Sequence, residues 1–179
     1  MTAYVEPEPE LGTAPVHLDL PDDHLALRDT FATFPSGVAT VAAQVDDVPV
    51  GLIVSSFVTV SLDPPLVSIC IDHGSTTWPR LRAAHRVGVS VLAGAHERTA
   101  RQFAGPAAGR FADIDVHVSP AGAVLVHEAA GWFECSVYDE VPAGDHDVVL
   151  LRVHGHRRGD SAEPLVFHRS RFRGLASDV

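Results

Sequence analysis

Residues 51–65, GLIVSSFVTVSLDPP, are the stretch that decides the fold. The stretch is rich in the β-branched and aromatic residues that strands favour, but Ser55 and Ser56 interrupt its apolar pattern. Residues 63–65, Asp-Pro-Pro, then stop any helix and force a turn, because two prolines remove two backbone donors. The apolar run 66–71 follows. The sequence therefore predicts a strand, a loop and a strand, with two hydroxyl groups that need partners if they are buried.

A small polar loop comes after the second of these strands. Residues 74–77, Gly-Ser-Thr-Thr, can offer backbone N–H groups and hydroxyls to a phosphate. Trp78-Pro79 predicts the start of a helix, whose positive dipole end would face that phosphate. The same residues also suit an ordinary helix cap, and the loop by itself does not separate the two interpretations.

The segment before residue 51 predicts an arm, a helix and a hairpin. Residues 1–20 contain alternating proline and glutamate, show no helical or strand period, and are predicted to be a mobile acidic arm. Residues 21–179 are predicted to form one domain. A helix is expected from Pro21 to about Phe34, because Pro-Asp-Asp is a start signal and apolar residues follow at helical spacing.

The rest of the chain predicts a mainly β fold. The expected strands are 37–44, 48–60, 66–71, 86–92, 123–127, 131–140, 146–156 and 165–168, and the further helices are 78–84 and 95–104. The short connections favour a mostly antiparallel sheet. A closed or nearly closed barrel is the usual way for so many short strands to hide their edges.

The composition limits the classes of function. The chain has 179 residues and a formal charge of −10, and all thirteen basic residues are arginine, so nucleic acid is not expected as a partner. No apolar run is long enough to cross a membrane, and a cytoplasmic location is predicted. Cys70 and Cys135 lie in apolar runs, which predicts reduced, buried thiols with raised pKa values and argues against a nucleophilic cysteine.

Three histidines could form part of a metal site. His154 and His156 would share one face of a strand, and His146 precedes them. A clear third ligand is missing, so no metal is predicted and a solvated strand edge explains the pair better. The chain also lacks the sequence motifs of dinucleotide-binding folds, P-loops, nucleophile elbows and zinc peptidases.

Several short motifs, in order, resemble the flavin reductase family with the FMN-binding split-barrel fold, the reductase components of two-component flavin monooxygenases. The similarity covers about residues 27–175. The matching pieces are 34–38 (FPSGV), 54–57 (VSSF), 61–67 (SLDPPLV), 75–77 (STT), 101–104 (RQFA), 144–146 (GDH) and 167–169 (FHR).

The resemblance implies a role for individual residues. Val54, Ser55 and Ser56 would line the isoalloxazine, with Ser61 and Leu62 flanking it, while Ser75, Thr76 and Thr77 would hold the phosphate. Ser90, Val91 and Phe103 would border the flavin, and His146 would orient the nicotinamide. The sequence departs from the family at Ile53, at Ser90 and at His73-Gly74, and these departures bear on phosphate affinity.

The resemblance also implies an activity. The expected protein is an NAD(P)H-dependent flavin reductase that binds FMN or FAD and NADH or NADPH, transfers hydride to flavin N5, and supplies reduced flavin to a separate monooxygenase. A homodimer with flavin near the interface is implied as well. From the residues alone other interpretations stay open: Ser55 and Ser56 as a bulge or a satisfied pair, Phe103 as core, and His146 as an exposed turn residue.

Two other split-barrel proteins remain as alternatives. The first is a non-catalytic flavin- or haem-binding protein, for which His73 or His85 could be the haem ligand. The second is a relative of pyridoxal-phosphate oxidases, although the basic cluster expected around the phosphate is missing from the sequence.

Overall fold

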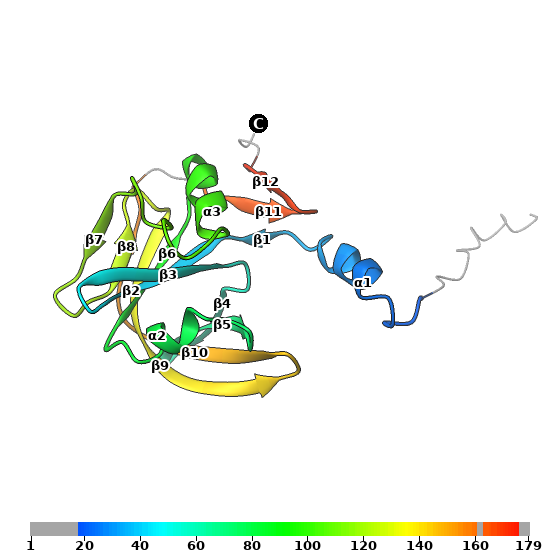
Figure 1. Ribbon diagram of the computed structural model, residues 1–179, viewed down its shortest axis with the longest axis horizontal. Coiled ribbons are helices and arrows are strands. Elements are labelled where there is room, and N and C mark those ends of the chain that lie inside the picture. Colours follow the sequence, from blue (N-terminus) through cyan, green and yellow to red (C-terminus); the bar gives the residue numbers. More distant parts are fainter. Residues whose placement is uncertain (1–17, 161–162, 176–179) are drawn as a thin grey trace, which may run out of the picture.

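The chain folds around one antiparallel sheet, which a computed structural model describes for residues 18–160 and 163–175 (Figure 1). Seven strands follow the order β3-β2-β6-β9-β10-β5-β4. They are β2 (Ala39–Val45), β3 (Val48–Val54), β4 (Val58–Leu62), β5 (Pro65–Asp72), β6 (Val87–Val91), β9 (Gly131–Ala143) and β10 (His146–Arg158). Every strand pair in this described sheet is antiparallel, so the predicted mainly β, mostly antiparallel fold is confirmed.

Smaller elements surround this sheet. Strands β1 (Ser36–Gly37), β11 (Val166–His168) and β12 (Arg171–Arg173) form a small sheet, and β7 (Val116–Val118) pairs with β8 (Val124–Val126). The helices are α1 (His24–Phe31), α2 (Trp78–Leu81) and α3 (Glu97–Phe103), with a 3₁₀ turn η1 (Gly94–His96) before α3. No helix in these described ranges is both long and apolar enough to span a bilayer.

The core lies inside the curled sheet, because alternate residues of each strand point inward. Side chains from β2, β5, β6, β9 and β10 fill it, among them Val41, Ile69, Val89 and Leu151, none of which exposes any surface. A second cluster around Leu92 and Leu165 packs α3 and the small sheet against the barrel. The long β9–β10 hairpin extends beyond the barrel (Figure 1).

Strand β6 is buried on both faces, as is the first part of β2. Its Val87 and Val89 face the core, while β8 crosses its other face. A Cβ atom at Gly88 would lie 2.2 Å from the carbonyl oxygen of Val124, so only glycine permits this approach.

The structure corrects several predicted boundaries. The expected strand 48–60 is two strands, β3 and β4, separated at residues 55–57. The helix expected at 78–84 is a single turn, 78–81, and the strand β12 was not predicted. The predicted arm 1–20 lies almost wholly outside the described residues.

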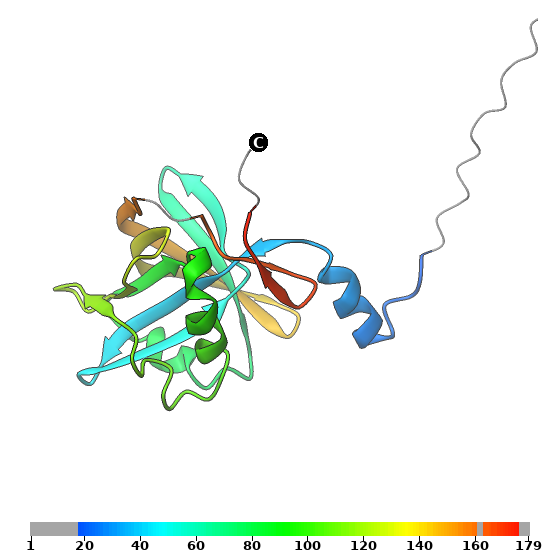
Figure 2. The same ribbon diagram turned by 90° about the horizontal axis from the view of Figure 1, so that it is seen from above.

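Helix α1 stands away from the barrel (Figures 1 and 2). The Asp23 carboxylate caps it, accepting hydrogen bonds from the N–H groups of Leu25 and Ala26 at 2.9 and 3.1 Å. None of the residues of α1 is buried. The predicted apolar stripe exists, with Leu25 75% and Phe31 66% exposed, but it does not pack on the rest of the described chain.

Candidate functional site

A groove of about 330 Å³ lies where the ends of β3 and β5 meet the start of β10. Five residues singled out in the sequence line it together: Val54, Ser55, Ser56, Ser75 and His146. Three separate segments supply them, so the groove is a product of the fold. Its remaining lining residues are Leu52, Ile53, Cys70, Ile71 and Asp72.

Ser56 joins the two strands that form the groove floor. Its hydroxyl accepts a hydrogen bond from the backbone N–H of Cys70 at 2.8 Å and donates to the carbonyl of the same residue at 3.4 Å. These bonds extend the antiparallel pairing of β4 with β5, where Val58 lies opposite Ser68, back into the link between β3 and β4. The Ser56 hydroxyl thus has hydrogen-bond partners within the protein as both donor and acceptor, whereas Ser55 is exposed and lines the groove.

Cys70 is a functional-site candidate that the sequence interpretation placed in the core. The thiol is exposed and lines the groove, so the predicted burial of Cys70 is wrong. On β5 the neighbours of Cys70, Ile69 and Ile71, are buried, and Cys70 shares the opposite face with the exposed Asp72. The alternation of inward and outward side chains along a strand could have predicted that Cys70 is exposed. Cys135 is buried as predicted, and burial raises its pKa to about 12.

Two histidine–aspartate pairs lie near the start of β10, and one of their residues, His146, lines the groove. The Nδ1 atom of His146 lies 2.6 Å from a carboxylate oxygen of Asp145, and His73 Nε2 lies 3.1 Å from Asp147. The hydrogen bond from His146, more than its charge, lowers the pKa of the Asp145 carboxyl. The His146 side chain is 40% exposed, so its ring is oriented yet accessible from the groove.

The proposed phosphate loop is less open to an anion than the sequence suggested. The Asp72 carboxylate already accepts the N–H of Gly74 at 2.5 Å, and its backbone carbonyl accepts the N–H of Ser75 at 2.9 Å. The Ser75 hydroxyl in turn accepts the N–H of Trp78 at 3.2 Å and so caps α2. A single-turn helix has little dipole to offer, so the phosphate site stays a prediction that depends on the loop's own N–H groups and hydroxyls.

The other two loop residues line a neighbouring cavity of about 390 Å³. Thr76 is exposed there, but Thr77 is 7% exposed and its hydroxyl accepts a hydrogen bond from Arg110 at 3.1 Å. The same guanidinium donates to the carbonyl of Gly51 at 2.8 Å. Arg80 also lines this cavity and is exposed. Neither arginine was singled out from the sequence.

Three predicted flavin-bordering residues lie elsewhere. Ser90 is fully buried, and its hydroxyl accepts the N–H of Val126 at 2.9 Å. Phe103 is 1% exposed and packs edge-on against Phe111 at 4.9 Å between ring centroids. Val91 pairs with Ala39 and Gly131 in the sheet. None of these three residues lines the groove in the described chain.

Ser61 and Leu62 lie on β4, at one edge of the seven-stranded sheet. Leu62 is 96% exposed and Ser61 is partly exposed. Neither lines the groove in the single chain.

The histidines weighed for a metal have other partners. The Nε2 atom of His154 lies 2.8 Å from the Ser136 hydroxyl, and desolvation with nearby Arg86 lowers the pKa of His154. The described residues contain no group of three or more His, Cys, Asp or Glu side chains arranged to hold a metal ion.

Comparison with known proteins places this site in a family. Residues 31–176 match the model of the flavin reductase like domain. The chain belongs to this family. The predicted resemblance is therefore confirmed, and the groove belongs to a flavin reductase-like fold.

Particular relatives agree with this assignment. An NADH-dependent FAD reductase of Streptomyces globisporus is 36% identical over 170 residues, covering 92% of this chain and 93% of that protein. The structure of a Streptomyces globisporus NADH:FAD oxidoreductase with NAD and FAD fragments superposes with a TM-score of 0.85 at 35% identity, covering 91% of this chain and 99% of the other. The reductase subunit of a flavin-dependent monooxygenase of Mycobacterium tuberculosis is 30% identical, covering 86% of this chain and 83% of that subunit.

Some relatives are longer than this chain. It spans 42% of a probable flavin reductase and 57% of a stachydrine N-demethylase reductase subunit, both from Rhizobium meliloti and both 37% identical. The similarity to these two proteins therefore concerns one part of each.

Proposed function

We propose that the protein is an NAD(P)H-dependent flavin reductase that supplies reduced flavin to a separate monooxygenase. The observation that carries the proposal is the single groove into which β3, β5 and the β9–β10 turn bring Val54, Ser55, Ser56, Ser75 and His146. These residues belong to the motifs shared with the family. The names of the relatives, an NADH-dependent FAD reductase and a monooxygenase reductase subunit, support the activity and the partner.

The residues of the groove fit a flavin ring. Val54 and Ile71 offer apolar surface, while Ser55 is exposed and has a hydroxyl and a backbone N–H beside it. Such donors stabilise the negative charge that develops at the N1/O2 edge when a flavin is reduced. The groove is open on one side, as expected if FMN or FAD enters and leaves as a diffusing molecule.

The phosphate end of the flavin is assigned to Ser75, Thr76 and the adjoining cavity. Thr76 and Arg80 are exposed side by side in the lining of that cavity, so a guanidinium is available close to the loop. Thr77 and Arg110 bind each other and hold the loop in place. Ser61 and Leu62 remain proposed flanking residues, reached from the edge strand β4.

The role proposed for His146 is to position the nicotinamide. The ring is held by Asp145 at 2.6 Å and lines the groove, where it can pack on a ring or bind a carboxamide. When bound, the nicotinamide supplies a hydride and the flavin accepts it at N5. The chain contributes alignment of the two rings and exclusion of water, and no general base is needed.

We further propose a homodimer. Large apolar side chains are exposed on α1, on the edge strand β4 and on the outer part of β9, which a second copy would cover. They are Leu25, Phe31, Phe34, Val58, Val60, Leu62, Tyr138 and Val141. Residues of β4 flank the groove in the family assignment, so the partner would complete the flavin site. A cytoplasmic location is proposed because NADH and NADPH are supplied there.

The purified full chain tests the function directly. Each pairing of NADH or NADPH with FMN, FAD or riboflavin is assayed by the loss of reduced-nicotinamide absorbance. Flavin-dependent oxidation of the nicotinamide is the expected result. Tight flavin binding without any oxidation would replace the proposal by a non-catalytic flavin-binding protein.

A further inference from the structure

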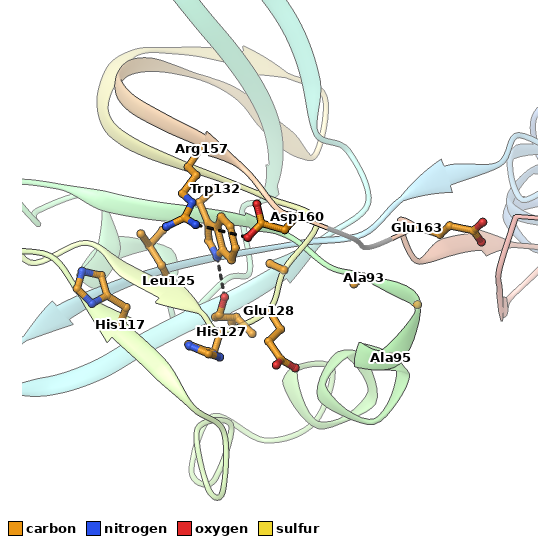
Figure 3. A pocket seen from close by; sticks show the side chains of 13 residues that line it. Ala93, Ala95, His117, Leu125, His127, Glu128, Trp132, Arg157, Asp160 and Glu163 are labelled. Atoms are coloured by element: carbon orange, nitrogen blue, oxygen red, sulfur yellow. Dashed lines mark hydrogen bonds and ion pairs between the residues drawn. The ribbon is translucent and has the colours of Figure 1, made fainter.

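A second cavity in the described chain is larger than the flavin groove. It measures about 910 Å³ and lies between η1, the β7–β8 hairpin, the start of β9 and the end of β10 (Figure 3). None of the residues lining the flavin groove lines it. It is therefore a separate cavity, and the proposed reductase activity does not require it.

The floor of this cavity is apolar and held in place by hydrogen bonds. Val126 and Ala129 are each 1% exposed, and the Trp132 indole N–H donates to the Val126 carbonyl at 2.7 Å (Figure 3). Nearby, His96 Nδ1 accepts the N–H of Ala93 at 3.1 Å, and burial lowers the pKa of His96, which keeps this nitrogen unprotonated. The floor is thus pre-formed around one aromatic ring.

The walls carry a surplus of negative charge. Three acidic residues line the cavity, Glu128, Asp160 and Glu163, with a single arginine, Arg157; the Glu163 carboxylate lies at the rim, on the side away from Trp132 (Figure 3). The Arg157 guanidinium lies 3.6 Å from a carboxylate oxygen of Asp160 and 5.9 Å from the centre of the Trp132 ring, so its positive charge already interacts with both side chains. Glu128 and Glu163 remain, and both are exposed. An occupant that complements this lining has an apolar or aromatic body and a positive group.

We propose that this cavity binds a small aromatic molecule that carries a protonated amine. The ring would lie over the apolar floor beside Trp132, and the ammonium group would be attracted by Glu128 and Glu163. The volume is sufficient for a molecule of this size, since ligand pockets usually measure about 300–1,000 Å³.

Calorimetric titration of the full chain tests this with 2-phenylethylammonium, using 2-phenylethanol and 3-phenylpropionate as uncharged and anionic analogues. We expect one site per chain, with the amine binding at least about tenfold more tightly than the alcohol. Of the two tryptophans, Trp78 is 5% exposed and buried, so a fluorescence change on binding should come from Trp132. Equal affinity for amine and alcohol would overturn the proposal.

Variants locate the site. Glu128→Gln with Glu163→Gln should weaken amine binding about tenfold. The matched control, Asp46→Asn with Asp47→Asn, removes the same charge at the exposed β2–β3 turn, where both residues have positive φ that asparagine tolerates. It should leave binding unchanged. Trp132→Phe should keep the affinity within about threefold while abolishing the fluorescence change, whereas Trp132→Leu should weaken binding.

Three results would contradict the assignment. One is an unaltered affinity in the double glutamine variant, and another is an equal loss in the aspartate control. The third is competition between the amine and saturating FMN or FAD, which would place the amine in the flavin groove. Because nicotinamide oxidation is not the readout, failure here leaves the proposed reductase activity untouched.

Discussion

The Ser56 hydroxyl and the backbone N–H of Cys70, 2.8 Å apart, connect the link between β3 and β4 to strand β5. Ser55, the adjacent residue, also lines the groove and is the more exposed of the two. Two serines with the same chemistry and consecutive numbers thus have different roles. Ser56 holds the β3–β4 link against β5, and the exposed Ser55 is the one available to a ligand.

Separate alanine variants should therefore behave differently. Ser56→Ala should lower the free energy of unfolding by about 0.5–1.5 kcal/mol, because the Cys70 N–H loses its partner. Ser55→Ala should leave stability unchanged and weaken flavin binding up to about tenfold. Urea unfolding and flavin fluorescence quenching measure the two effects. A weaker flavin affinity in Ser56→Ala, with stability and Ser55→Ala both unaffected, would reverse these assignments.

Thiol labelling should distinguish the two cysteines. In the native protein at pH 8, an alkylating reagent should modify Cys70, which is exposed, and leave Cys135 unmodified, as measured by mass spectrometry. Bound flavin should slow the labelling of Cys70, because the thiol lines the groove. Equal labelling of both residues in the folded chain would contradict the buried position of Cys135.

The pKa of Cys135 also predicts a pH dependence of stability. Burial raises this pKa from 9.0 to about 12, so between these values the unfolded chain loses the thiol proton while the folded chain retains it. Stability from this group is complete below about pH 9 and falls as the pH rises toward 12. Cys135→Ala should reduce that fall in urea titrations at pH 9 and 10.5, with Cys70→Ala as the control.

Gly88 offers a test of the packing of β8 on β6. In Gly88→Ala the new methyl group would lie 2.2 Å from the Val124 carbonyl oxygen, so β8 must move. We expect a loss of at least about 2 kcal/mol in unfolding free energy, the usual scale for overpacking. Gly37→Ala, where a Cβ meets no atom within 4 Å, is the matched control and should change stability little. Equal stability of the two variants would mean that β8 does not pack tightly here.

Much of the fold was predictable because it depends on local signals. Runs of β-branched residues, broken by proline, glycine and aspartate, predicted eight strands. In the structure, seven of these runs contain a strand of the main sheet or the strand β8. Distant contacts were not predictable in this way. Ser90 was expected near the flavin, yet it is buried because β8, more than thirty residues later in the chain, covers that face of β6.

The groove itself illustrates the same limit. Ser55, Ser75 and His146 were identified through family motifs, and the fold brings them together. The sequence did not identify Cys70 or Arg80 as site residues, because neither lies in a motif that indicates a chemical role. Strand alternation placed Cys70 beside Asp72, but an apolar neighbourhood led to the opposite conclusion.

Residues 1–20 should be dispensable for flavin reduction, because their sequence is rich in proline and glutamate and has no apolar period. The deletion should keep kcat/KM within about tenfold, or about 1.4 kcal/mol.

Substitution of the apolar stripe on α1 should instead change the oligomeric state: Leu25→Glu with Phe31→Glu should shift the molecular mass measured by light scattering from dimer to monomer. A dimer that persists in this variant, or a larger loss of activity in the deletion, would contradict the respective expectation.

His146 should be required for the nicotinamide and not for the flavin. Its imidazole is oriented by Asp145 at 2.6 Å and borders the groove, so it can align the hydride donor without exchanging a proton in the chemical step. His146→Ala should raise KM for the nicotinamide and lower kcat/KM by about one to two orders of magnitude, while the flavin Kd stays near its original value. His156→Ala, an exposed imidazole on the same strand, is the matched control and should retain full activity. Because alignment and not proton transfer is lost, the pH profile of the remaining activity should keep its shape. Unchanged kcat and nicotinamide KM in His146→Ala would mean that the donor enters by another side of the groove.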